Sequence, residues 1–206
     1  MELLDLPSEL LAMILSDVAV RKRWVGVEEV ETRMGVITLA KLCQVCEEFR
    51  EVVLHDVVST ASVLRFDEEE EEGDGGCEDR IDIMQNLLEV VRHARGAVEV
   101  DFSRCVGVRL FNGPRGMKWM REVVEELGDR SRWNFQHSAL VVDSVVKCLK
   151  DFRVLNLAST LHVTDSVFET WREKNCLQDL QVLSLRWARN VGTDQTLRIL
   201  ADHCRR

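Results

Sequence analysis

Two stretches near the end of the chain carry the same pattern of residues, and this repetition constrains the fold more than any other feature. When residues 152–176 are set above residues 180–204, apolar and small residues coincide with a constant offset of 28 positions. A fixed period of this size is typical of a solenoid, in which each repeat is one supersecondary unit stacked on the next. The coinciding pairs are Phe152 and Leu180, Leu155 and Leu183, Leu157 and Leu185, Thr160 and Ala188, Val163 and Val191, and Cys176 and Cys204.

Looser versions of this unit precede the two regular ones. Short segments with strand-like apolar patterns recur at intervals of 36, 33, 22 and 28 residues, and apolar residues at helical spacing occupy 79–95, 117–127 and 139–149 between them. A return to a parallel strand needs about a dozen residues or more, which every interval provides. The sequence thus predicts an α/β array of parallel strands with helices on the convex side. The strands centre on Leu64-Arg65-Phe66, Val100-Asp101-Phe102, Trp133-Asn134-Phe135, Leu155-Asn156-Leu157 and Leu183-Ser184-Leu185.

Residues 1–58 have a different pattern and predict a separate helical module before the array at 59–206, which is irregular over 59–150 and regular over 152–206. Pro7 fits the first turn of a helix, where its missing N–H costs nothing. A second helical run begins near Val36, and 28–33 between them predicts one or two further helical turns. The apolar residues of the first run are Leu6, Leu10, Leu11, Ile14 and Leu15, and those of the second are Leu39, Leu42, Cys43, Val45, Cys46, Phe49, Val52 and Val53. Helices this short cannot bury them all, so they pack on the rest of the chain or dock another protein.

Charge and cysteine content narrow the class of protein. The 206 residues hold 36 Asp and Glu against 27 Lys and Arg, a net charge of −9, which argues against a nucleic-acid binder with its basic face. The acidic run 67–72 predicts a solvated loop. Seven cysteines, an odd number falling mostly within apolar patterns, indicate reduced thiols and a cytoplasmic or nuclear protein. No signal peptide and no apolar run approaching the roughly 20 residues of a membrane span is found.

The sequence offers little chemistry. Cys43-x-x-Cys46 has the spacing of a metal or redox pair, but it lies on an apolar helical stripe, and no second pair follows at structural-zinc spacing. No nucleophile, phosphate-loop or dinucleotide motif occurs. We therefore expect no catalytic residue, no metal and no cofactor.

The outward positions of the strands form the candidate partner-binding row. Residues between inward apolar ones point to the opposite face of a strand, so this row is exposed on the concave side. An ordinary hydrated sheet face is the alternative interpretation. Trp187 is the best single anchor candidate, because tryptophan is enriched at interface hot spots. The row consists of Arg65, Asp101, Asn134, Asn156 and Ser184, flanked by Asp67, Ser103, Gln136, Ala158 and Arg186.

Two resemblances connect these features. The Leu-x-Leu units resemble leucine-rich repeats, and Val163-Thr164-Asp165 with the closing Cys176 resembles their cysteine-containing subtype. Leu6-Pro7-Ser8-Glu9-Leu10-Leu11, Ile14-Leu15 and later Val45-Cys46 with Phe49-Arg50 resemble an F-box, although its two halves are farther apart than in the family. Proteins that join these modules are the substrate receptors of SCF ubiquitin ligases.

The F-box resemblance implies a docking site for the adaptor Skp1 and, through it, for a cullin complex. Its expected contacts are Leu6, Pro7, Leu10, Leu11, Ile14, Leu15, Leu39, Val45, Cys46 and Phe49. The repeats are then expected to hold a protein substrate for ubiquitin transfer and proteasomal degradation. The alternative is a non-catalytic repeat scaffold whose N-terminal helices only cap the array, since solenoids need a polar-faced terminal cap.

Overall fold

The computed structural model of the chain describes residues 12, 20–25, 29–66, 77–103, 105, 113–138 and 141–204. The fold is mixed α/β, and it divides into two compact units, unit 1 (Met1–Val98) and unit 2 (Glu99–Arg206). The sequence predicted a boundary after residue 58. Strand β3 (Val63–Arg65) and helix α4 (Cys77–His93), which the prediction assigned to the repeat array, belong to unit 1.

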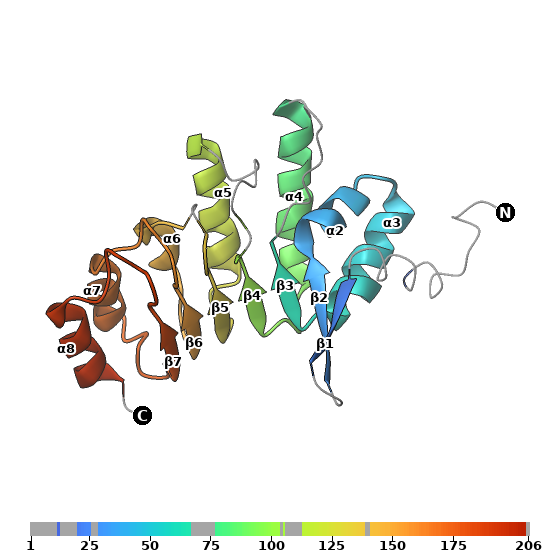
Figure 1. Cartoon of the computed structure of the whole chain (residues 1–206). Helices are drawn as coiled ribbons and strands as arrows, with labels where there is room; N and C mark the ends of the chain where they lie inside the picture. Colours follow the sequence, from blue (N-terminus) through green and yellow to red (C-terminus); the bar gives the residue numbers. More distant parts are fainter. Residues whose placement is uncertain are drawn as a thin grey trace. The chain divides into compact units, whose positions relative to one another are not determined.

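Unit 2 contains four short strands that are parallel and follow one another in chain order (Figure 1). Trp133 pairs with Leu155, and Leu155 pairs with Leu183. These registers confirm the predicted offsets of 22 and 28 residues between the last three strands. The strands are β4 (Glu99–Asp101), β5 (Arg132–Asn134), β6 (Val154–Asn156) and β7 (Val182–Ser184).

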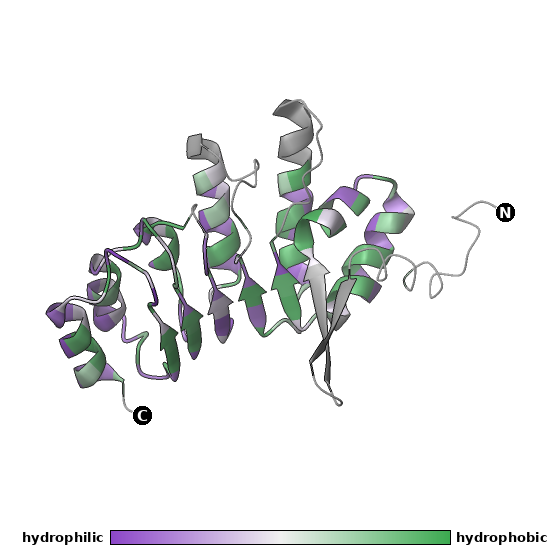
Figure 2. Cartoon of the chain, in the orientation of Figure 1, coloured by the Kyte–Doolittle hydropathy of each residue, from purple (hydrophilic) through white to green (hydrophobic). Residues whose placement is uncertain are grey.

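A helix follows each of these strands and covers one side of the row (Figure 1). The helices are α5 (Gly113–Glu126), α6 (Asp143–Val146), α7 (Ser166–Glu173) and α8 (Asp194–His203). Hydrophobic residues run through β6 and β7 and along parts of the helices (Figure 2). Within the described part of the chain, none of the helices has the length and apolar character that crossing a membrane requires.

The core of unit 2 is built by the inward positions of the strands. Phe135 stacks on Phe102, with 5.4 Å between ring centroids, and on Trp133 at 5.7 Å. Trp171 of α7 contacts Phe152 at 4.8 Å and is fully buried. Each of these rings contributes apolar area that one strand and one helix cannot bury alone, so neighbouring repeats must supply the rest.

Unit 1 contains a hairpin that the sequence analysis missed. Strands β1 (Val20–Val25) and β2 (Glu29–Gly35) pair antiparallel, and β2 pairs in parallel with β3. The prediction of helical turns at 28–33 is therefore wrong. The period of two that marks a strand was present, because Val30, Thr32 and Met34 alternate with Glu29, Glu31 and Arg33.

The helical run expected from Val36 is confirmed and is divided in two. Helix α2 (Val36–Leu42) ends before a turn at Cys43, and α3 (Glu47–Val52) continues into a π-helical turn at 53–57 and a 3-10 turn at 58–60. Helix α2 packs on α4, and Arg50 of α3 forms an ion pair with Glu89 of α4. The segment thus shares a core with α4. The first predicted helix, at residues 6–15, lies outside the described residues except for Ala12.

The equivalent positions Leu155 and Leu183 test how far burial depends on a neighbouring repeat. Leu155 is fully buried between β5 and β7, whereas Leu183 in the last strand is partly exposed. We expect Leu155→Ala to lower the free energy of unfolding by about 2–5 kcal/mol and Leu183→Ala by less than about 2 kcal/mol. Urea titration followed by circular dichroism measures both. Equal losses would contradict the dependence on a neighbour.

Candidate functional site

The polar row on the outer face of the strands has a structural task. The Oδ1 atoms of Asp101, Asn134 and Asn156 each accept a hydrogen bond from the backbone N–H two residues on, at 2.9, 3.2 and 3.0 Å. Such Asx turns hold the loop that follows each strand. Asp101 is moreover only 3% exposed. In these three predicted contact residues, the Oδ1 atom is therefore already bonded within the fold.

The remaining residues of the predicted row differ in how far they are open to a partner. Ser184 is partly exposed and Arg186 is exposed, whereas Ala158 is buried. Arg65 is partly buried and belongs to unit 1, in β3. Asn156 donates from Nδ2 to the side-chain oxygen of Gln136 at 3.3 Å, which links two neighbouring repeats. Asp67 lies outside the described residues.

Trp187 is the most exposed large apolar residue of the described chain, with 70% of its surface open. The guanidinium carbon of Arg186 lies 6.0 Å from the centroid of its ring, within the range of a cation–π contact. Its backbone φ of +63° lies in the left-handed region, which is strained for a bulky side chain. The anchor candidate is thus exposed and held in an unfavourable conformation.

The repeat imposes this conformation. His137 and Ser159, the residues equivalent to Trp187 in the two preceding repeats, both have φ of +58°. Their backbone N–H groups donate to carbonyl oxygens of the next repeat, from His137 to Ala158 at 3.0 Å and from Ser159 to Arg186 at 2.8 Å. A left-handed residue is therefore part of each joint between repeats. The sequence offsets of 22 and 28 already align these three residues, but their shared φ is not visible in the residue types.

Two carboxylates fasten each repeat to the next. Asp143 accepts hydrogen bonds from the backbone and hydroxyl of Thr164, at 2.7 and 2.6 Å, and from the hydroxyl of Ser166 at 2.7 Å. Asp165 accepts from the backbone N–H of Gly192 at 2.9 Å and from the hydroxyl of Thr196. Sequence reasoning did not assign these roles. The sequence did contain a signal for these roles, because Asp143 and Asp165 are 22 residues apart, which is also the offset between the strands of their two repeats.

The predicted adaptor contacts divide into three groups. Leu39 and Phe49 are buried in unit 1, at 0% and 6% exposure, and serve its core. Val45, in the turn between α2 and α3, is 61% exposed, and Cys46 beside it is partly exposed. The other six lie outside the described residues: Leu6, Pro7, Leu10, Leu11, Ile14 and Leu15.

Four of the described thiols have raised pKa values. Burial, together with the charge of Glu89, raises the pKa of Cys43 to about 11 against the opposing effect of Arg50. Burial also raises the pKa of Cys148, Cys176 and Cys204. A thiolate is the reactive and ligating form, so these groups stay protonated at neutral pH. In the described part of the chain, no cluster of three or more His, Cys, Asp or Glu side chains has a metal-binding arrangement.

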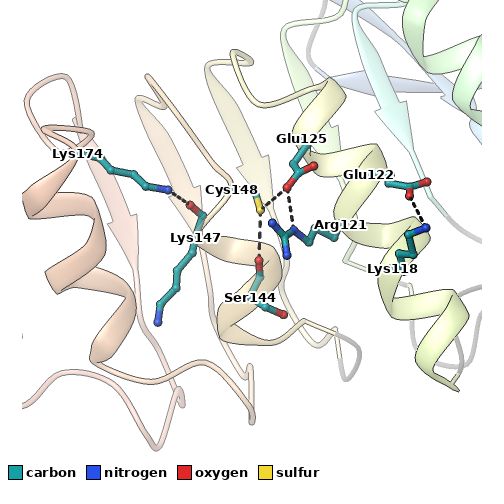
Figure 3. A network of polar contacts seen from close by, with 8 residues as sticks. All are labelled: Lys118, Arg121, Glu122, Glu125, Ser144, Lys147, Cys148 and Lys174. Atoms are coloured by element: carbon teal, nitrogen blue, oxygen red, sulfur yellow. Dashed lines mark hydrogen bonds and ion pairs between the residues drawn. The ribbon is translucent and has the colours of Figure 1, made fainter.

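The polar contacts on the helical side are satisfied within the fold (Figure 3). Arg121 and Glu125 pair at 2.8 Å on α5, and the Cys148 thiol donates to Glu125 at 3.4 Å. The Lys174 ammonium donates to the carbonyl of Lys147 at 3.0 Å. These contacts join α5, α6 and the turn after α7.

No protein-family model matches this chain, and a search of curated proteins finds no relative.

Replacing Trp187 tests the strain at its backbone. A left-handed conformation destabilises a non-glycine residue by about 1–2 kcal/mol. This is at least as large as the stabilisation of about 0.5–1 kcal/mol from an exposed cation–π contact. We expect Trp187→Gly to leave the free energy of unfolding unchanged or slightly raised. Trp171→Ala, in the core, should lower it by about 3–5 kcal/mol. Denaturant titration compares the two, and a loss above about 1 kcal/mol in Trp187→Gly would rule out the strain.

Acid titration tests the joint at Asp165. Burial opposes ionisation of this carboxyl, but hydrogen bonds from Thr196, Thr193 and Gly192 outweigh it and lower its pKa. A lowered folded-state pKa gives stability that is present above the unfolded pKa of about 3.9 and is lost as pH falls through the folded value. We expect Asp165→Asn to cost about 1–2 kcal/mol at pH 7 and to flatten the loss of stability at acid pH. Asp202→Asn, at an exposed position, is the control. Equal losses of stability in the two variants would contradict the stabilising role of Asp165.

Proposed function

We propose that this chain is a non-catalytic, protein-binding adaptor of the leucine-rich-repeat type, and that it serves as the substrate-recognition subunit of an SCF ubiquitin ligase. The observation that carries the proposal is the regular parallel register of β5, β6 and β7, with Arg186 and Trp187 exposed after the last strand. Parallel strands at such short intervals, with a helix after each, are the supersecondary unit of leucine-rich repeats.

The adaptor role adds the N-terminal module to this surface. Val45 is a large apolar side chain that unit 1 leaves 61% exposed, and it lies in the part of the sequence that resembles an F-box. Because this exposed side chain lies within the segment that resembles an F-box, we assign the Skp1 contact to it. The chain itself then performs no covalent step. It holds a substrate close to the ubiquitin-transfer machinery, which contributes to rate through proximity.

One observation favours the alternative of a repeat scaffold with a terminal cap. Leu39 and Phe49, two of the expected Skp1 contacts, are buried in unit 1, where α2 packs on α4. In the adaptor role these two residues hold the shape of the module, and the contact falls to Val45, Cys46 and the segment at residues 6–15.

Co-purification with Skp1 separates the two functions. We expect the wild-type chain to retain Skp1, and Val45→Asp to lose it, because a carboxylate in an apolar interface is left unpaired. Leu6→Ala/Pro7→Ala with Ile14→Asp should lose it as well. Leu197→Asp is the matched control, since Leu197 of α8 is also a large apolar residue at 56% exposure. Equal retention by all variants, or by none including the wild type, would exclude Skp1 docking at this module.

A further inference from the structure

The surface around Trp187 combines exposed aromatic, apolar and basic groups. We call Leu161, His162, Arg186, Trp187 and Arg189 the Trp187 patch. All five are exposed, with Leu161 at 51% and Trp187 at 70%. The two stretches that build it, 152–164 and 180–193, contain no Asp or Glu, although the whole chain carries a net charge of −9. The patch is thus a basic region on an acidic protein.

Two hydrogen bonds hold the two loops of the patch side by side. The N–H of Ser159 donates to the carbonyl of Arg186 at 2.8 Å, and the Asn190 amide donates to the carbonyl of Leu161 at 2.7 Å. These bonds hold the loop after β6 against the loop after β7. Residues from two repeats are therefore presented together and in a fixed arrangement.

The arginines of the patch differ from two basic residues of α5, which are paired with carboxylates. There, Lys118 pairs with Glu122 at 3.5 Å and Arg121 pairs with Glu125 (Figure 3). Among the described residues, neither Arg186 nor Arg189 has a carboxylate partner. Asp194 follows Arg189 by five residues and is exposed, and Asp165 of the preceding repeat is engaged by Gly192 and Thr196. Two guanidinium groups are left to bind anions from outside.

The positions beside Trp187 leave its ring accessible. In the preceding repeat, small residues occupy the equivalent places, with Ala158 aligned to Arg186 and Ser159 aligned to Trp187. The strained backbone of Trp187 gives no stability that a glycine would not give. The joint between repeats accounts for the backbone conformation of Trp187 but not for a large exposed aromatic side chain, which points to a role in recognition.

We propose that the Trp187 patch binds an acidic peptide segment of a partner protein, with carboxylates on Arg186 and Arg189 and an apolar side chain on Trp187 and Leu161. Arginine pairs with carboxylates in a bidentate geometry, and tryptophan supplies the apolar anchor. Charge complementarity carries the choice of partner. A nucleic acid would bring phosphates to the same arginines, but its charged backbone would extend beyond them over a protein of net charge −9, whereas a short acidic segment needs to contact the patch alone. This inference rests on the proposed protein-binding function and names the chemistry of its substrate.

Selection from a random dodecapeptide library displayed on phage, with the full chain as bait, tests the proposal. Enriched peptides are synthesised with a fluorescein label and titrated by anisotropy against the wild type and two charge-reversal variants. Arg186→Glu/Arg189→Glu alters the patch, and Arg172→Glu/Arg198→Glu makes the same charge change on exposed arginines of α7 and α8. Trp187→Gly is the third variant, and circular dichroism verifies that each is folded.

We expect the enriched peptides to be rich in Asp and Glu, to contain an aromatic or apolar residue, and to bind more weakly as salt rises. Their affinity should fall at least about tenfold in Arg186→Glu/Arg189→Glu and in Trp187→Gly, and less than about threefold in Arg172→Glu/Arg198→Glu. Enriched peptides that are neutral or basic, or that bind all variants alike, would refute acidic-peptide binding at the Trp187 patch. The proposed protein-binding function would not be affected by that result. No enrichment, or tighter binding of a labelled single-stranded oligonucleotide than of the peptides, would overturn both.

Discussion

Burial in unit 2 depends on a neighbour, and the other features of the unit follow from this constraint. Leu155 and Leu183 are the same residue at equivalent positions, yet Leu155 is fully buried and Leu183 is not, because in the described part of the chain only Leu155 lies between two strands. In a stacked array each unit supplies half of the core of the next. The register between strands must therefore be held closely, and the polar residues around the strands are used to hold it.

Most of the polar row has this task. The Asx turns at Asp101, Asn134 and Asn156 shape the loops, and Asp143 and Asp165 fasten each loop to the next repeat. The sequence alone could not separate this role from recognition. An outward-facing asparagine is compatible with both, and the difference lies in whether a backbone N–H two residues away takes its oxygen.

The strand positions of unit 2 were predictable because apolar periodicity is a local property, and the register confirms them at Trp133, Leu155 and Leu183. The hairpin at β1 and β2 was not predicted. Its alternation of charged and uncharged residues is typical of a strand, but the segment is rich in charge and was interpreted as helical turns. The boundary at Val98 was not predicted either, because it depends on α2 packing on α4, a contact between residues distant in sequence. Pairings of this kind leave no periodic trace.

The joints between repeats constrain the backbone conformation of the residue after each strand, but they do not constrain its side chain. The left-handed residue after each strand is needed for the hydrogen bond to the next repeat, as at His137 and Ser159, and its side chain is free to vary. Trp187 occupies this position at the last strand of the described chain, where glycine or asparagine would be less strained. Within unit 2, the cation–π contact with Arg186 compensates this cost only in part. We therefore connect the 70% exposure of Trp187 with the acidic segment proposed above, whose charge would match Arg186 and Arg189, two arginines without a carboxylate partner among the described residues.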